Sequence, residues 1–192
     1  MTAAPLVLTC GDPAGIGPEL AVKARLALGA DLPFVWIGDP RHLPRGAAFA
    51  EVTTPADALS VAPGLLPVLR HDFPQPATPG QPDLRNAQGV VDVIARAVAL
   101  VQAGAASALC TAPIAKKVLK DGAGFAFPGH TEYLAHLGGD VPVVMMLACP
   151  DLRVVPATIH IALSEVPKAL TADGLRQVIR ITRDGLIRDC GI

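Results

Sequence analysis

The sequence contains few aromatic residues, no long apolar run and no excess of one charge. Aromatic residues make up 4% of the chain although 51% of its 192 residues are hydrophobic, so alanine, valine, leucine and isoleucine must build the core. That composition favours a layered α/β protein over an aromatic-rich sandwich. The net charge of −1 excludes an electrostatic footprint for nucleic acid, and no apolar segment reaches the roughly 18–20 residues of a membrane span. With no signal-peptide pattern at the start, we expect a cytoplasmic protein with no nucleic-acid or membrane partner.

Paired cysteines are also lacking, since the four cysteines are widely spaced and form no Cys-x-x-Cys motif. Cys10, Cys110 and Cys149 each end an apolar run that is typical of a strand. The pattern therefore predicts buried thiols in a reducing compartment rather than disulfides.

Apolar runs alternate with amphipathic stretches along the chain, which is typical of strands alternating with helices. Strands are expected at 5–10, 33–39, 107–113, 141–149 and 152–161, and helices at about 18–28, 90–104 and 172–189. The proline-rich segment 40–82 is expected to carry one or two edge strands. The last two strands are joined by a two-residue link, which predicts an antiparallel pair. The whole indicates an α/β fold with a mainly parallel sheet and an antiparallel excursion.

The stretch "GDPAGIGPEL" at 11–20 is rich in glycine but matches neither common nucleotide motif. After Gly15 and Gly17 the third fingerprint position is Leu20, and no Gly-Lys-Ser/Thr follows. It predicts a strand–turn–helix unit whose helix N-terminus can hold an anion or a carboxylate. The alternative is a plain turn in which Asp12 or Gly17 caps the helix.

A second helix start is expected at "FPGHTEYLAHL", residues 127–137. His130 and Thr131 follow a Pro-Gly turn there, where side chains and free N–H groups bind a hydroxyl, a carboxylate or a phosphate. Alternatively, Thr131 is only an N-cap and His130 is exposed. His136, further along the same helix, is expected on the surface.

Two further residues are candidates for a site. His160 precedes "SEVP" at the expected end of a strand, where ligands and metals collect in open α/β sheets; a lone histidine is also common as a structural residue. Lys116 follows the strand 107–113 and either lies on a solvated helix face or reaches an anionic substrate group. His42 and His71, in the proline-rich segment, have no convergent partners in the sequence.

Five blocks of the sequence carry a family resemblance when they are taken in order. They are "GDPAGIGPEL" (11–20), "TAPIAKKVL" (111–119), "PGHTEYLA" (128–135), "VVMMLA" (143–148) and "LRVVPATIHIALSEV" (152–166). Together they resemble the 4-hydroxythreonine-4-phosphate dehydrogenase family of pyridoxal phosphate biosynthesis.

The resemblance implies a three-layer α/β/α fold similar to that of isocitrate and isopropylmalate dehydrogenases. On this basis residues 1–130 are expected to form a first, incomplete α/β lobe and residues 131–192 the start of a second, dimer-forming lobe. It also implies a homodimer with the active site at the subunit interface.

The activity implied by the resemblance is oxidation of the secondary hydroxyl of 4-phosphooxy-L-threonine by NAD or NADP, followed by metal-assisted decarboxylation. A divalent metal (zinc, magnesium or cobalt) is implied, held by three histidines from both subunits, of which His160 matches the first. His130 and Thr131 match the pair that binds the small phosphorylated substrate. Lys116 matches the lysine of the "TGP" block and is a candidate for the catalytic base, whereas no cofactor-binding residue is assigned.

The chain departs from the family pattern in two blocks and in length. Ala112 replaces a glycine, and its methyl group is expected to leave less room for another group to approach the backbone there. Cys10 replaces a proline. The family continues beyond the part matched here, so we expect a truncated chain that is inactive alone. The alternatives are a related dehydrogenase for 4-phosphothreonate, 4-phosphoerythronate or a cis-dihydrodiol carboxylate, and, from another class, an inactive remnant that acts only as a binding module.

Overall fold

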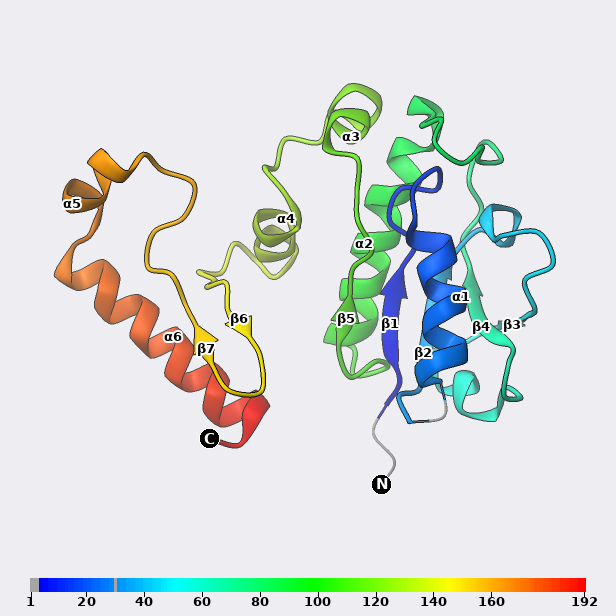
Figure 1. Cartoon of the computed structure of the whole chain (residues 1–192), viewed down its shortest axis with the longest axis horizontal. Helices are drawn as coiled ribbons and strands as arrows, with labels where there is room; N and C mark the ends of the chain where they lie inside the picture. The colour runs from blue at the N-terminus through cyan, green and yellow to red at the C-terminus, as the bar shows by residue number, and fades with distance from the viewer. Residues whose placement is uncertain (1–3, 30) are drawn as a thin grey trace. The chain divides into compact units, whose positions relative to one another are not determined.

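The computed structural model describes residues 4–29 and 31–192 and divides the chain into two units, one ending at Gly129 and one running from His130 to Ile192. The first unit contains β1 (Leu6–Thr9), α1 (Gly17–Leu28), β2 (Phe34–Gly38), η1 (Pro40–His42), β3 (Phe49–Val52), η2 (Pro55–Ser60), β4 (Leu66–Arg70), η3 (Leu84–Asn86), α2 (Ala87–Gln102), β5 (Leu109–Cys110) and α3 (Lys116–Ala123). The second contains α4 (His130–Leu137), β6 (Leu147–Ala148), β7 (Arg153–Val154), η4 (Leu163–Glu165), α5 (Val166–Ala169) and α6 (Ala172–Cys190). Figure 1 shows these elements along the chain.

A five-stranded parallel sheet forms the centre of the first unit, in the order β3-β4-β2-β1-β5. Its strands are short and apolar, and β2 is buried along its whole length, as expected for a parallel sheet between helices. The α/β class with a mainly parallel sheet is therefore confirmed, and the expected antiparallel excursion is present as the pair β6 and β7.

Helix α2 covers one face of the sheet because its apolar residues recur at helical spacing. Val90, Val93, Ile94 and Ala97 are all buried, and α2 packs against β1, β2 and β5. Helix α1 lies on the other face, beginning with Pro18 in its first turn as the sequence predicted.

The proline-rich segment supplies β3, which lies at the edge of the sheet as expected, and β4, which lies inside the sheet. The amide of Leu66 donates to the carbonyl of Ala48, 3.0 Å away, on the β3 side. Successive amides point to opposite sides of a strand, so Pro67 faces β2, whose pairing with β4 begins only at Val68. The absence of an N–H group at Pro67 therefore removes no hydrogen bond between β4 and its neighbours.

The second unit has less strand than the sequence predicted. The expected strands 141–149 and 152–161 shrink to β6 and β7, two residues each, with Leu147 opposite Val154. Helix α6 is confirmed, beginning after Thr171, whose hydroxyl accepts a hydrogen bond from the amide of Gly174. It ends at Gly191 in the left-handed conformation that glycine favours.

Candidate functional site

The loops after β1 and β5 lie side by side at the carboxyl edge of the sheet, where the strand order reverses. Strand β1 pairs with β2 on one side and with β5 on the other. Helix α1, which follows β1, and helix α2, which precedes β5, lie on opposite faces (Figure 1). Ligands of open α/β sheets bind at such a switch point, so these two loops form the first candidate region.

Backbone contacts hold these two loops together. The amide of Asp12 donates to the carbonyl of Pro113 at 2.9 Å. The amide of Ala112 donates to the buried hydroxyl of Thr9 at 3.3 Å. The loop that leads to α3 is therefore positioned by residues of the first strand.

The glycines of the first loop are explained by internal packing. A Cβ atom at Gly17 would lie 2.0 Å from the carbonyl oxygen of Cys10. Gly11 has a φ of +66°, and its Cβ would lie 2.4 Å from the carbonyl oxygen of Pro113. The methyl group of Ala112 would lie 2.9 Å from a Cβ atom at Gly11 and 3.1 Å from one at Gly17.

The helix cap differs from the plain-turn alternative. Ile16 is the N-cap of α1, and its side chain makes no capping bond. Asp12 instead accepts a 2.9 Å hydrogen bond from the amide of Ala14, so it orders the turn before the helix. Neither Asp12 nor Gly17 is the cap.

Lys116 is the first residue of α3 and its side chain is exposed. Its neighbour Lys117 pairs with Asp121 across one helical turn at 2.6 Å, whereas Lys116 has no ion-pair partner among the described residues. Lys116 follows the loop that is hydrogen-bonded to Thr9 and Asp12. These hydrogen bonds fix the position of its backbone relative to β1.

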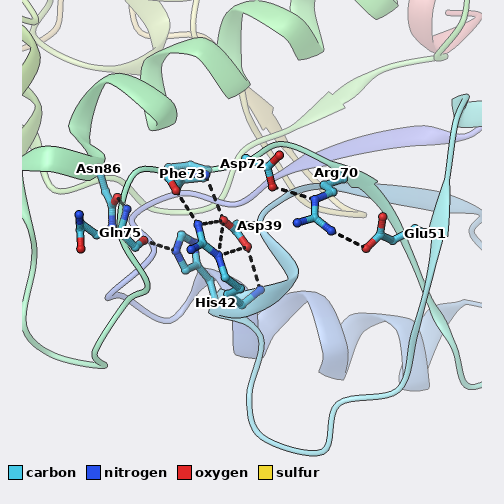
Figure 2. Close-up of polar contacts among 9 residues, drawn as sticks. Asp39, His42, Glu51, Arg70, Asp72, Phe73, Gln75 and Asn86 are labelled. Atoms are coloured by element: carbon cyan, nitrogen blue, oxygen red, sulfur yellow. Dashed lines mark hydrogen bonds and ion pairs between the residues drawn. The ribbon is translucent and has the colours of Figure 1, made fainter.

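A polar network joins the ends of β2 and β4 (Figure 2). Asp39, fully buried, accepts hydrogen bonds from the Arg41 guanidinium at 2.6 Å and from the amide of Phe73 at 3.0 Å. Burial alone would raise the pKa of Asp39, but the hydrogen bonds from Arg41 and Phe73 outweigh it and lower the pKa to about 2. Asp39 is therefore ionised at neutral pH.

His42 extends this network to the start of α2. Its Nε2 lies 2.9 Å from the carbonyl oxygen of Gln75, whose amide donates to the Asn86 side chain. Burial lowers the pKa of His42, so the ring is neutral and Nε2 carries the hydrogen. His42 and His71 also pack edge-on against Phe73, with ring centroids 5.0 and 5.5 Å apart. His42 and His71, which have no convergent partners in the sequence, thus meet at Phe73 in the fold.

A cleft of about 580 Å³ lies beside this network, between the first loop, η1 and residues 77–79. Its polar lining residues are Arg41, His42, Arg45, Glu19 and Thr78. The amide of Gly80 donates to the carbonyl of Ala14 at 2.8 Å, which ties the outer wall to the first loop. In the sequence, only the run "FVWIGD" indicated this cleft, because an acidic residue directly follows a buried strand there.

His130 and Thr131 begin α4, as the sequence predicted. Both are half-buried, and Tyr133, two residues after Thr131, is buried. His136, near the other end of α4, is exposed and pairs with Asp140 at 2.8 Å, which confirms its place on the surface.

His160 does not lie at a strand end, which corrects the sequence-based placement. Strand β7 ends at Val154, and His160 is an exposed residue of the following loop with a φ of +57°. That left-handed conformation is uncommon outside glycine. Within residues 4–29 and 31–192 no three His, Cys, Asp or Glu side chains are grouped to hold a metal.

The thiols also differ from expectation, because only Cys10 is buried among the four described cysteines. Cys110 lies on the edge strand β5, and it, Cys149 and Cys190 are exposed. All four are free thiols. Among the described helices, none has both the length and the apolar character required to cross a membrane.

A scan against protein families matches residues 30–192 to the family described as pyridoxal phosphate biosynthetic protein PdxA. The chain belongs to the PdxA family. It is 63% identical over 99% of its length to a 4-hydroxythreonine-4-phosphate dehydrogenase of Paracoccus denitrificans, and 59% identical over 98% to that of Roseobacter denitrificans. The chain covers 59% and 58% of these two relatives.

Solved structures agree with the fold. A 4-hydroxythreonine-4-phosphate dehydrogenase from Klebsiella pneumoniae superposes with a TM-score of 0.88 at 33% identity, over 97% of this chain and 60% of that one. A terephthalate 1,2-cis-dihydrodiol dehydrogenase from Burkholderia xenovorans shares the fold, with a TM-score of 0.65 at 23% identity, over 93% of this chain and 55% of that one.

Proposed function

We propose that the chain forms part of a nicotinamide-dependent dehydrogenase that oxidises the secondary hydroxyl of 4-phosphooxy-L-threonine, with subsequent decarboxylation, in pyridoxal 5'-phosphate biosynthesis. The observation that carries this proposal is the 63% identity, over 99% of the chain, to a relative that bears the name of that dehydrogenase. The likeness to the dihydrodiol dehydrogenase, at 23% identity, concerns the fold alone and favours no other substrate.

Substrate binding is assigned to the start of α4. His130 and Thr131 lie in the first turn of this eight-residue helix, where the N–H groups have no acceptor within the helix and, with the helix dipole, favour an anionic or hydroxyl-bearing group. The Thr131 hydroxyl can donate to or accept from such a group, and the His130 imidazole can donate to it.

Lys116 is proposed to take up the proton of the substrate hydroxyl. An exposed lysine at the first residue of a pinned helix has the reach and the freedom to approach a bound substrate. A lysine Nζ accepts a proton only in its uncharged form.

The described residues supply only part of a ligand set for a divalent metal. His160 offers an exposed imidazole, which is a common metal ligand, but the described residues supply no second and third donor beside it. We therefore assign His160 as one donor to a metal centre that other residues must complete, and derive no step through the metal.

The nicotinamide cofactor receives no assigned residue. The space where a Cβ atom of Gly11 or Gly17 would lie is filled by the backbone of Pro113 or Cys10. The absence of side chains at these glycines therefore allows the two loops to pack and leaves no room for a pyrophosphate. The hydride acceptor is supplied by the cofactor when it is bound.

A homodimer is proposed through the second unit. Helix α6 and the segment after β7 line an apolar groove of about 520 Å³. Leu175, Ile179 and Ile187 of α6 are exposed along it, and exposed apolar patches of this kind mark interaction surfaces.

The test is an assay of NADH formation with the purified chain, alone and after co-expression with the part of the Paracoccus denitrificans relative that lies outside the match (the reconstituted preparation). The substrates are 4-phosphooxy-L-threonine, 4-phosphoerythronate and a cis-dihydrodiol carboxylate, each with zinc or magnesium. Oxidation of the first substrate supports the proposal. Oxidation of only the other two overturns the substrate assignment, and inactivity of both preparations favours a binding module.

A further inference from the structure

The cleft between the first loop, η1 and residues 77–79 is lined by charges of both signs. Arg41 and Arg45 line it on the η1 side, and Glu19 lines it from the first turn of α1. No ion pair joins Glu19 to either arginine within the part of the chain that the structure describes. The volume of the cleft, about 580 Å³, is that of a small-molecule site, which is typically about 300–1,000 Å³. The cleft can therefore take a ligand that carries both an anionic and a cationic group.

Arg41 is held in one orientation but keeps part of its guanidinium free (Figure 2). Its Nε and Nη2 donate to the Asp39 carboxylate, and Nη2 also donates to the carbonyl of Phe73 at 2.5 Å. The other terminal nitrogen, Nη1, makes no hydrogen bond to a described residue, and 46% of the side chain is exposed. Because Asp39 already balances its charge, Arg41 contributes oriented donors to the cleft and no net positive charge.

Arg45 and Glu19 supply the charges that the fold leaves unbalanced. Both side chains are exposed, and neither has a hydrogen-bond or ion-pair partner among the described residues. A guanidinium binds a carboxylate or a phosphate with two parallel hydrogen bonds, whereas the carboxylate of Glu19 accepts from an ammonium or hydroxyl group. Together they favour a ligand with a charge of each sign over a simple anion.

His42 adds an unsatisfied acceptor to the residues that line the cleft. Its Nε2 donates to Gln75, so Nδ1 is an acceptor, and this buried atom has no hydrogen-bond partner among the described residues. Buried polar atoms without a partner are rare in proteins. A ligand with an N–H or O–H donor is one partner that the cleft can bring to this side.

The walls of the cleft are rigid because prolines form much of them. Four of its lining residues are proline: Pro13, Pro18, Pro44 and Pro79. Each proline ring fixes its own φ, so these segments have little conformational freedom to lose when a ligand binds. A site that is already in its binding conformation binds a small ligand at a lower entropic cost.

We propose that this cleft binds a small zwitterion, a molecule that carries a carboxylate or a phosphate together with an ammonium group. Arg45 and Nη1 of Arg41 bind the anionic group, and Glu19 binds the ammonium group. An amino acid and an amino-bearing phosphate ester share this chemistry. The site lies wholly within the first unit and does not rest on the proposed reaction or on the helix α4.

The test is an NMR titration of the purified chain, labelled with nitrogen-15, with three related compounds. L-threonine carries a carboxylate and an ammonium group, O-phospho-L-threonine adds a phosphate, and 3-hydroxybutyrate is L-threonine without its amino group. We expect at least one zwitterion to shift amide signals of residues 13–19, 41–45 and 77–79. The 3-hydroxybutyrate should bind at least about tenfold more weakly than L-threonine, because it has no group for Glu19 to bind.

The two zwitterions distinguish the sources of the anionic group. Tighter binding of O-phospho-L-threonine assigns a phosphate to Arg45, and equal or tighter binding of L-threonine assigns a carboxylate. Absence of shifts in these three segments with both zwitterions at about 10 mM, a concentration that detects even weak binding, overturns the proposal. Equal affinities for L-threonine and 3-hydroxybutyrate overturn the zwitterion as the ligand.

Two substitutions test the two ends of the ligand separately. Arg45→Gln should weaken binding of the zwitterion by about tenfold, because a charge-assisted hydrogen bond is lost. Glu19→Gln should lower the affinity for L-threonine to that for 3-hydroxybutyrate. Arg180→Gln is the matched control, since Arg180 is an exposed arginine of α6 without an ion-pair partner among the described residues. Equal affinities of the Arg45→Gln and Arg180→Gln variants would contradict the proposal.

A direct ion pair between Arg45 and Glu19 across the cleft is the competing arrangement. It is detected by a double-mutant cycle on the free energy of unfolding, measured without ligand for the parent chain, Arg45→Gln, Glu19→Gln and the double variant. Additive effects leave both charges available for a ligand, as proposed. A coupling between the two residues would show that they neutralise each other and would overturn the proposal.

Discussion

A Cβ atom at Gly17 would lie 2.0 Å from the carbonyl oxygen of Cys10, closer than any side chain can approach. This contact fixes the distance between the end of β1 and the first turn of α1. The first loop therefore depends on a glycine for its packing, although it lacks a nucleotide fingerprint.

Gly17→Ala should lower the free energy of unfolding of the first unit by more than about 2 kcal/mol, because the backbone of β1 must shift to admit the methyl group. Trp36, the single tryptophan, is buried in β2, so its fluorescence in a urea titration measures this unit. Gly46→Asn is the control: position 46 has a φ of +80° and open space around it, so the loss should stay within about 1 kcal/mol. Equal losses would refute the steric explanation.

Acid should destabilise the first unit through Asp39. The pKa of Asp39 is about 2 in the folded chain against an ordinary value of 3.8. At pH values above 3.8 the ionised carboxylate therefore stabilises the folded chain. This stabilisation, about 2 kcal/mol, is lost as the pH falls from about 4 to about 2.

The measurement is urea unfolding followed by Trp36 fluorescence at several pH values. Asp39→Asn removes the titrating group, so its stability should be lower at neutral pH and should depend less on pH across that window. If both chains lose stability in parallel as the pH falls, Asp39 is not the group responsible.

Alkylation should distinguish Cys10 from the other thiols. Burial raises the pKa of Cys10 to about 12, against an ordinary value of 9.0, so its thiolate fraction near neutral pH is about a thousandfold lower. Iodoacetamide should modify Cys110, Cys149 and Cys190 in the folded chain, and all four thiols in urea. Modification of Cys10 at the rate of Cys190 in the folded chain would show that the end of β1 opens to solvent.

Local patterns predicted the regular elements of the first unit well. Helix α2 was recognisable because Val90, Ile94 and Ala97 recur at helical spacing, and β2 because its apolar run is short and closed by glycine. The interior position of β4 was not predictable from composition. It depends on which side of the strand the Pro67 ring faces, and that is set by the register with its neighbours.

The site was less predictable because its contacts join distant segments. Asp39 and Phe73 are 34 positions apart, and they meet only because β2 and β4 are neighbours in the sheet. The placement of His160 failed for a different reason: the segment 152–161 was predicted to be one strand, but the described chain there pairs only over Arg153–Val154.

Removal of the His160 imidazole should reduce metal binding in the reconstituted preparation. His160→Asn is preferable to alanine because asparagine tolerates the φ of +57° at this position. We expect about 10–100-fold weaker zinc binding by calorimetry, at least the effect of losing a supporting contact. His71→Asn, in the first unit, is the control. Unchanged zinc affinity in His160→Asn would remove His160 from the metal site.

Two histidines of the same helix provide the sharpest test of the substrate site. His130 lies in the first turn of α4, where N–H groups can bind an anionic ligand, whereas His136 lies near the other end and pairs with Asp140. His130→Ala should raise the KM for 4-phosphooxy-L-threonine or lower kcat by about 10–100-fold in the reconstituted preparation, the range expected when a charge-assisted hydrogen bond of about 1.5–3 kcal/mol is lost. The KM for the nicotinamide cofactor should change little, and His136→Ala should leave all constants near those of the parent. If His136→Ala impairs the reaction as strongly as His130→Ala, the effect arises from the stability of α4, and the helix N-terminus is not the substrate site.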